Sequence, residues 1–375
     1  MKLFEFEAKK ILEENGIAVP WGRIAHSAAE AEAIAREMGS PAVLKAQVLV
    51  AGRGKSGGIL FASDAAEAGK TAARLLGSTI KGNTVSSLLV EEKLDISGQF
   101  YASVAIDRQA RRYVILASSE GGIDIEETAL ASPDKIARSW ADPATGFNQA
   151  AAVEMLGNFR LGENDTVRFA AVLDRLYTIA MDYDAELVEV NPLARTAAGE
   201  FIAADARIII DDNALFRHPE LKGLSSAGAE DTPLEAEARK QNLAYVDLDG
   251  DIGIVGNGAG LMMATLDLVH YFGGRPANFL DIGGGGNVDT TKNGLLMVMS
   301  KPAVKAVLVN ILGGITRCDV VARAIITALN ESRDKKPVVV RMMGTNETEG
   351  NRMLHQAGIA TCPDVEEAIE EVLKL

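Results

Sequence analysis

The sequence predicts a chain of two parts, an α+β domain followed by an α/β domain built on a doubly wound parallel sheet. Its 375 residues exceed what one hydrophobic core ordinarily supports. A polar stretch at 221–237 interrupts the hydrophobic periodicity, and beyond it the pattern becomes a regular alternation of strand, glycine loop and helix. We therefore place a boundary in this stretch and expect domains at 1–236 and 237–375.

The first domain opens with two helices. Phe4 and Leu12 lie on the apolar face of the first helix. Ser27 and Glu30 have the spacing of a capping box and begin a second, alanine-rich helix. The elements expected after it are a strand at 42–48, a helix near 64–76, a strand near 85–92 and two strands that turn at Asp107.

A glycine loop at 52–58 follows the strand at 42–48. Arg53 and Lys55 supply two cations there, and the glycines allow backbone N–H groups to approach a polyphosphate. We favour a phosphate-binding loop over a flexible surface hairpin because Lys45, on the preceding strand, adds a third cation. The loop is not a Walker A motif, since the first glycine of that motif would fall on Leu49.

An antiparallel hairpin is expected from Glu186 onward, where ELVEVNPL and EFIAADARIII flank the turn Ala197-Ala198-Gly199. Glu189 and Asn191 lie two residues apart and so on one face, and Asp205 on the returning strand can join them. Such oxygen donors suit Mg²⁺, which takes few protein ligands beside water and phosphate oxygens. A solvated sheet face with incidental carboxylates explains the pattern equally well.

The second domain alternates strands with helices. Its glycine loops 256–260 and 313–316 each follow a strand and open a helix, a setting that favours carboxylate or phosphate binding. A dinucleotide site is the less favoured alternative: Asp281 could take the place of a ribose-binding acid, but Leu261 occupies the position of the last glycine in that motif. The strands are expected near 252–255, 277–281, 304–311 and 338–342.

Composition and charge exclude several classes of protein. Thirty-eight basic residues against 52 acidic ones give a net charge of −14, which disfavours nucleic acid and anionic membrane as partners. Without a spanning apolar run or a secretory signal, we expect a cytoplasmic chain. Of the two cysteines, Cys318 stands at a helix start that can activate a thiol, although a buried structural role is favoured. None of the four histidines lies in a glycine loop, so none is assigned to catalysis.

Several segments together resemble the β subunit of the ADP-forming succinate–CoA ligases, over essentially the whole chain. The matching segments are LFEFEAKKIL, KAQVLVAGRGKSGG, SSEGGIDIE, EVNPL, NALFRHPEL, VDLDGDIGIVGNGAGLMM, PANFLDIGGGG and KAVLVNILGGITRCD. The resemblance implies an ATP-grasp domain followed by a flavodoxin-like domain. It also implies a reaction that passes through an acyl phosphate and a phosphohistidine, with the histidine and the CoA site on a partner α subunit.

The resemblance further implies a role for each site residue. Nucleotide, ATP or GTP, would contact Lys45, Gly52, Arg53, Gly54, Glu91, Leu94 and Gln99, with Glu91 and Leu94 lining the adenine and ribose pocket. Asn191 and Asp205 would hold Mg²⁺, and Glu189 would meet the partner's histidine. The small carboxylic acid would bind at Asn257, Gly314, Ile315 and Thr316.

Two positions depart from the family pattern. Gln99 stands where glutamate is common, and Thr316 stands where valine is usual. A hydroxyl at 316 could receive a substrate hydroxyl, so malate or another substituted acid is an alternative to succinate. A nucleotide- and anion-sensing module without ligase chemistry is a second alternative. The sequence leaves the acid, ATP against GTP, and the αβ or α2β2 stoichiometry open.

Overall fold

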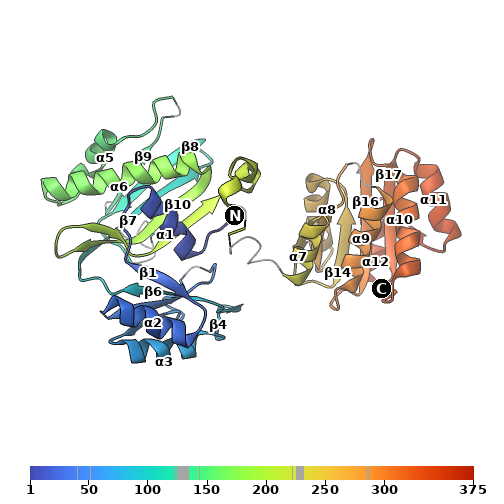
Figure 1. Cartoon of the computed structure of the whole chain (residues 1–375). Coiled ribbons are helices and arrows are strands. Elements are labelled where there is room, and N and C mark those ends of the chain that lie inside the picture. Colours follow the sequence, from blue (N-terminus) through green and yellow to red (C-terminus); the bar gives the residue numbers. More distant parts are fainter. Residues whose placement is uncertain are drawn as a thin grey trace. The chain divides into compact units, whose positions relative to one another are not determined.

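The computed structural model describes residues 1–375 except 40, 51, 123–124, 126–134, 143, 222, 225–231 and 285–286. The chain forms two compact units, Met1–Ala229 and Glu230–Leu375 (Figure 1). The boundary expected between 236 and 237 falls within helix α7 (Pro233–Lys240), which packs on a strand of the second unit. Parts of the SSEGGIDIE segment, of the polar stretch at 221–237 and of the glycine run at 283–286 lie outside the described residues.

A small antiparallel sheet of the first unit carries Lys45. Its strand order is β1–β6–β2–β3, with bounds β1 (Gly22–Ala25), β6 (Leu88–Glu92), β2 (Ala42–Ala46) and β3 (Ile59–Ala62). Helices α2 (Ala28–Met38) and α3 (Ala65–Leu75) pack together on one side of it (Figure 1). As expected, α2 begins where the Ser27 side chain accepts a hydrogen bond from the Glu30 N–H, at 3.2 Å. A two-stranded ribbon, β4 (Thr79–Ile80) and β5 (Asn83–Thr84), follows α3.

A larger antiparallel sheet forms the rest of the first unit. Its order is β11–β10–β7–β8–β9, and β12 also pairs with β10. Helix α6 packs on it, and the rings of Phe100, Phe169 and Phe201 meet in the core with centroids 5.4–5.5 Å apart. The bounds are β7 (Ile96–Asp107), β8 (Arg112–Ser118), β9 (Ile136–Trp140), α5 (Gln149–Met155), α6 (Glu163–Asp182), β10 (Ala185–Thr196), β11 (Phe201–Ala203) and β12 (Ala206–Ile210). The expected hairpin is therefore confirmed, with its returning strand broken at 204–205.

The N-terminal helix α1 (Glu5–Glu14) joins the two sheets. It packs on β12 and α6, and Leu3 donates a backbone hydrogen bond to the Ile208 carbonyl at 3.0 Å. The Phe6 N–H bonds the Gln47 side chain at 3.2 Å, just beyond β2. Short 3-10 turns complete the unit at Leu156–Asn158, Asp212–Arg217 and Pro219–Leu221. No helix among the described residues combines the length and apolar character that crossing a bilayer needs.

The second unit is the predicted doubly wound sheet. Apart from the antiparallel edge strand β13, its order β15–β14–β16–β17–β18 is the 2-1-3-4-5 order of flavodoxin-like folds. Its two core clusters, one around α9 and α10 and one around α8 and α12, lie on opposite faces of the sheet. The bounds are β13 (Ala244–Asp247), β14 (Ile252–Gly256), α8 (Ala259–Tyr271), β15 (Asn278–Asp281), α9 (Val288–Ser300), β16 (Ala306–Gly313), α10 (Cys318–Glu331), β17 (Val338–Gly344), α11 (Glu347–Gln356), β18 (Ala360–Thr361) and α12 (Val365–Leu373).

This strand order places a topological switch point between β14 and β16. The chain leaves β14 for β15 on one side and later returns to β16 on the other. Ligands of open α/β sheets bind outside the carboxyl ends of the strands at such a point. Both glycine loops singled out in the sequence, after Gly256 and after Gly313, start at these strand ends.

Gly344 offers a test of this edge. It pairs with Gly313 across β16 and β17 at a φ of +135°, and a Cβ on it would lie 2.0 Å from the Gly313 carbonyl oxygen. We expect Gly344→Ala to destabilise this edge by about 1–3 kcal/mol. Hydrogen–deuterium exchange should show faster exchange in peptides from β16 and β17. Gly260→Ala is the matched control, because nothing lies within 4 Å of its added Cβ; equal protection in the two variants would contradict this account.

Candidate functional site

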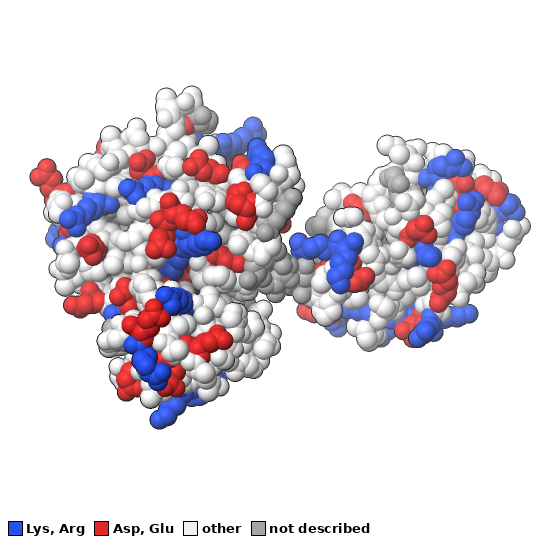
Figure 2. Space-filling model, viewed as in Figure 1, with Lys and Arg blue, Asp and Glu red and all other residues white. Residues whose placement is uncertain are grey.

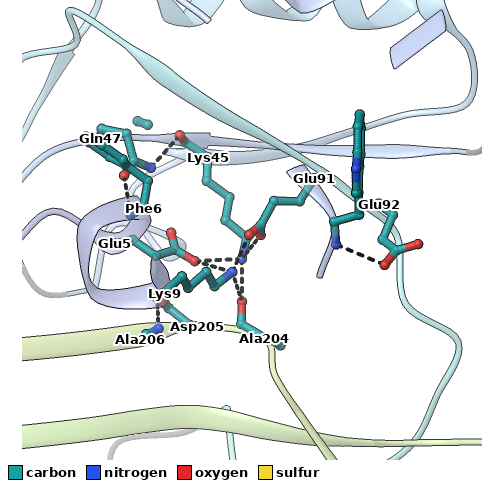
Figure 3. Close-up of polar contacts among 12 residues, drawn as sticks. Glu5, Phe6, Lys9, Lys45, Gln47, Glu91, Glu92, Ala204, Asp205 and Ala206 are labelled. Atoms are coloured by element: carbon teal, nitrogen blue, oxygen red, sulfur yellow. Dashed lines mark hydrogen bonds and ion pairs between the residues drawn. The ribbon is translucent and has the colours of Figure 1, made fainter. Parts of the chain in front are cut away.

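Six charged side chains meet where helix α1 and the small sheet approach the broken strand β11–β12. Figure 3 shows Glu5, Lys9, Lys45, Glu91 and Asp205 among them. On the visible face of each unit, acidic and basic side chains are interspersed (Figure 2). Inside the first unit, three buried cations each pair with carboxylates. We call this group the six-charge cluster; its members are Glu5, Lys9, Lys45, Arg53, Glu91 and Asp205.

Lys45 lies in β2, whose five residues are all buried. Its Nζ lies 2.8 Å from Glu5 Oε1 and 2.7 Å from Glu91 Oε2, and donates to the Ala204 carbonyl at 2.5 Å. Burial opposes the charge of Lys45, but the neighbouring carboxylates, Glu5 first, outweigh it and raise the lysine pKa. The lysine is therefore held as a cation in the absence of a ligand.

Arg53 points from the glycine loop into the same cluster. Its guanidinium bonds the Glu5 carboxylate, lies 2.9 Å from Asp205 Oδ1, and donates to the Ala46 carbonyl at 3.3 Å. Burial opposes its charge as well, yet Glu5 and Asp205 raise its pKa. The structure thus brings together Lys45, Arg53 and Asp205, three residues that the sequence analysis assigned to nucleotide and metal.

The glycine loop itself differs from expectation. The N–H groups of Ser56 and Gly58 donate to the Arg53 carbonyl, and that of Gly57 donates to Gly54, because the loop closes into successive tight turns. These groups are therefore engaged within the loop, whereas the sequence analysis counted on N–H groups open to a phosphate. Gly52, Gly54 and Lys55 are exposed.

Asp205 is the accessible member of the cluster. Its side chain is 32% exposed, whereas the other five side chains are at most 10% exposed. Burial of the carboxyl and repulsion from Glu5 raise its pKa, although Arg53 acts in the opposite direction. A ligand or metal that approaches the cluster through solvent therefore meets Asp205.

Asn191 faces the same interruption of the sheet. The pairing of β10 passes from Val190↔Ala206 to Leu193↔Ala203, so Asn191 lies at the bulge opposite 204–205. Its side-chain oxygen accepts a hydrogen bond from the Gly122 N–H at 2.7 Å. Gln99 lies beside the same glycine, because a Cβ added to Gly122 would be 2.5 Å from Gln99 Oε1.

The other predicted nucleotide and catalytic residues are distributed around this group. Glu91 is 2% exposed and its carboxylate pairs with two lysines, so its place in an adenine and ribose pocket stays a prediction. Leu94 follows β6 and is half-buried. Glu189, also half-buried, pairs in register with Ser103 and Arg207, and its role toward a partner's histidine stays a prediction.

The sequence analysis missed Glu5 and Lys9. Both lie in α1 with their side chains 1% and 5% exposed. A signal was present: Glu5, Lys9 and Leu12 are spaced by four and then three residues, which places two opposite charges on the apolar face of an amphipathic helix. Charged residues in such a position are buried and must find partners.

In the second unit, Asn257 ties together the ends of β14 and β16. Its amide donates to the Leu312 carbonyl and accepts from the Leu312 N–H, both at 3.0 Å. It also donates to the Thr316 hydroxyl at 3.2 Å, which in turn donates to the Gly284 carbonyl at 3.2 Å. The Thr316 side chain, expected to meet substrate through its hydroxyl, is therefore engaged between loops and only 2% exposed.

Of the remaining residues at this edge, some are exposed to solvent and others make hydrogen bonds within the unit. Gly314 is exposed and Ile315 is 81% exposed. Asp281 accepts from the Gly258 and Gly283 N–H groups at 2.6 and 2.7 Å, so it caps the loops and is not open to a ribose. Burial raises the pKa of the Cys318 thiol, which argues for its structural role over an activated thiol.

Comparison with known proteins agrees with this architecture. Residues 2–195 match the ATP-grasp domain family and residues 255–374 match the CoA-ligase family. The structure of ATP citrate lyase from Methanothrix soehngenii, in complex with citrate and coenzyme A, has a TM-score of 0.76 over 100% of this chain and 99% of that chain. At 18% identity, it supports the fold alone.

Relatives of similar length are named as β subunits of succinate–CoA ligases. The chain is 49% identical to the β subunit of an ADP-forming succinate–CoA ligase from Pyrobaculum aerophilum, over 100% of this chain and 99% of the relative. It is 47% identical, with the same coverage, to the β subunit of a GDP-forming succinate–CoA ligase from Thermus thermophilus. The chain belongs to the family of succinate–CoA ligase β subunits, which are components of acid–thiol ligases.

Proposed function

We propose that this chain is the nucleotide-binding β subunit of an ADP-forming ligase that makes succinyl-CoA reversibly from succinate, CoA and ATP. The reaction passes through an acyl phosphate and a phosphohistidine on a partner α subunit, which also carries the CoA site. The observation that carries the proposal is the meeting of Lys45, Arg53 and Asp205 in one buried cluster. Membership of the family supplies the class of reaction.

Lys45 and Arg53 neutralise the phosphate oxygens of the nucleotide. Both are buried, and charges act more strongly on one another where water is excluded. Phosphoryl transfer depends chiefly on positioning and on stabilising the charge of the transferring group. Cations held in place before the ligand arrives meet both requirements.

Mg²⁺ fits the oxygen donors of this site. Asp205 is partly exposed, and it lies with Asn191 at the same interruption of the large sheet. Two protein oxygens are a usual number for Mg²⁺, which completes its shell with water and phosphate. When bound there, the ion would neutralise charge on the phosphate oxygens.

The phosphohistidine belongs to the partner in this proposal. His218 is 8% exposed, and its ring nitrogens lie 2.7 Å from Asp184 and 3.2 Å from Glu220. His270 and His355 lie within α8 and α11, and His26 precedes α2. None of the four histidines lies within a glycine loop of the sequence, which supports a phosphohistidine supplied by a partner chain.

The acid is succinate in this proposal. It would bind at the loops that carry Asn257 and residues 314–316. Because the Thr316 hydroxyl is engaged by Asn257 and Gly284, it does not serve as a receptor for a substrate hydroxyl. The departure from valine at this position therefore gives no argument for malate.

The first test is Lys45→Met in the complex with its partner. Removing a buried cation that faces the phosphates should lower nucleotide-dependent turnover by about 100-fold or more. Calorimetric titration with ATP and with GTP should show weaker binding of whichever nucleotide the wild type prefers. Lys70→Met, at an exposed position of α3, is the control. Near-wild-type turnover of the Lys45 variant would remove this residue from the site.

The metal assignment is tested with Asp205→Asn, which keeps the shape of the side chain and removes its charge. The Mg²⁺ concentration that supports half-maximal turnover should rise by about 10-fold or more. The dissociation constant of Mg²⁺ from the nucleotide complex, measured directly, should rise in parallel. Glu186→Gln, close to the start of β10, serves as the control. An unchanged Mg²⁺ titration in the Asp205→Asn variant would mean that Asp205 is only a carboxylate at the edge of the sheet.

Thr316→Val tests the choice of acid. If the hydroxyl only ties the loops, the variant should change KM for succinate and for malate by the same factor, and Thr316→Ser should restore both. CoA-thioester formation with the two acids, measured side by side, gives the two constants. A selective loss with malate would instead place the hydroxyl against the substrate and overturn the assignment of succinate.

A further inference from the structure

Lys9 lies in the six-charge cluster beside Lys45, with which it shares its partners (Figure 3). Its Nζ lies 2.5 Å from Glu91 Oε1 and 2.9 Å from Glu5 Oε1, and donates to the Ala204 carbonyl at 2.8 Å. These three partners match the three donors of an ammonium group. They come from α1, from β6 and from the break between β11 and β12, so one side chain links the N-terminal helix, the small sheet and the large sheet.

Glu5 holds the two phosphate-binding cations at a fixed spacing. One carboxylate oxygen lies 2.8 Å from Lys45 Nζ, and the other bonds the Arg53 guanidinium. Glu5 itself is 1% exposed. Burial acts against its charge, but Arg53, Lys45 and Lys9 together keep its pKa well below the usual value, so the carboxylate stays ionised.

The charges in the cluster balance, with three cations against three carboxylates. When Lys45 and Arg53 engage a polyphosphate, they bring the phosphate charge toward Glu5 and Glu91. Those two carboxylates then need another counter-ion, because like charges at this distance repel strongly in a buried site. Lys9 is that counter-ion, since it already contacts both.

Stability alone does not account for this arrangement. Apolar residues of similar volume often stabilise a protein as well as a buried ion network does. Helix α1 also has its own apolar anchors, because Ala8 and Leu12 are completely buried. The gathering of six charges at one point, five of them buried, therefore calls for a role in the site.

We propose that Glu5 and Lys9 are positioning residues of the nucleotide site: Glu5 sets the spacing of Lys45 and Arg53, and Lys9 neutralises Glu5 and Glu91 while the other two cations bind phosphate. This inference rests on the proposed binding of nucleotide at the cluster. It extends that site to the N-terminal helix, and it assigns Glu91 to the ionic framework beneath the phosphates.

The experiment uses the assembled complex with Lys9→Met, Lys9→Arg and the isosteric Glu5→Gln. Lys9→Met and Glu5→Gln should each raise the KM for ATP and the calorimetric dissociation constant of ADP by about 10-fold or more. The KM values for succinate and CoA should stay within twofold of wild type. Lys9→Arg should recover most of the ADP affinity, because it restores the charge.

Lys10→Met is the matched control. Lys10 is the next residue of the same helix, but its side chain is 72% exposed and its nearest carboxylate, Glu14, lies 3.9 Å away. We expect wild-type constants from this variant. If Lys9→Met does not fold, Glu5→Gln, which changes no volume, carries the test.

Two results would overturn the proposal. One is an ADP dissociation constant within twofold of wild type in both Glu5→Gln and Lys9→Met, or in Glu5→Gln alone where Lys9→Met does not fold. The other is an equal change in the constants for all three substrates, which indicates a purely structural role. ADP binding is measured directly and does not depend on which acid the complex uses. A wild-type complex that binds ADP but forms no succinyl-CoA would therefore refute the proposed function without affecting this test.

Discussion

The buried balance of three cations and three carboxylates is the constraint on which the first unit depends. Its members come from α1, β2, the glycine loop, β6 and the break between β11 and β12. An isolated charge in such a place is strongly unfavourable, and deleting one partner of a buried pair typically costs about 3–5 kcal/mol. Segments as far apart in sequence as residues 5 and 205 are therefore held together by the requirement that every charge be matched.

The same balance supports the proposed polyanion site in a chain with a net charge of −14. The cations are kept ionised by neighbouring carboxylates. In the proposed function, nucleotide binding is an exchange of partners, in which phosphate oxygens replace carboxylate oxygens around existing charges. Such an exchange favours a ligand with several negative charges and an accompanying metal, because a weaker anion does not compete with Glu5 and Glu91.

Local patterns in the sequence predicted an α+β first half and a doubly wound parallel sheet in the second, whereas the ATP-grasp and flavodoxin-like folds were implied by the family resemblance. The strand that carries Lys45, the hairpin and the doubly wound alternation follow from periodicity and glycine placement, and the structure confirms them. What periodicity did not reveal is the partner of each charge. Lys9 meets Ala204 across 195 residues, and the N–H groups of Ser56, Gly57 and Gly58 are engaged by turns of their own loop. Both outcomes depend on tertiary contacts that no local pattern encodes.

The edge of the second unit shows why such a chain requires a partner. Asn257, Asp281 and Thr316 use their polar atoms to hold three loops together. Arg317, the nearest cation in sequence, is paired with Asp319 at 3.0 Å. The groups left facing solvent there are backbone at Gly314 and the apolar side chain of Ile315. A dicarboxylate brought to this edge still needs positive charge opposite its second carboxylate. In the proposed function, that charge comes either from Arg317, if the acid displaces its Asp319 partner, or from the partner subunit.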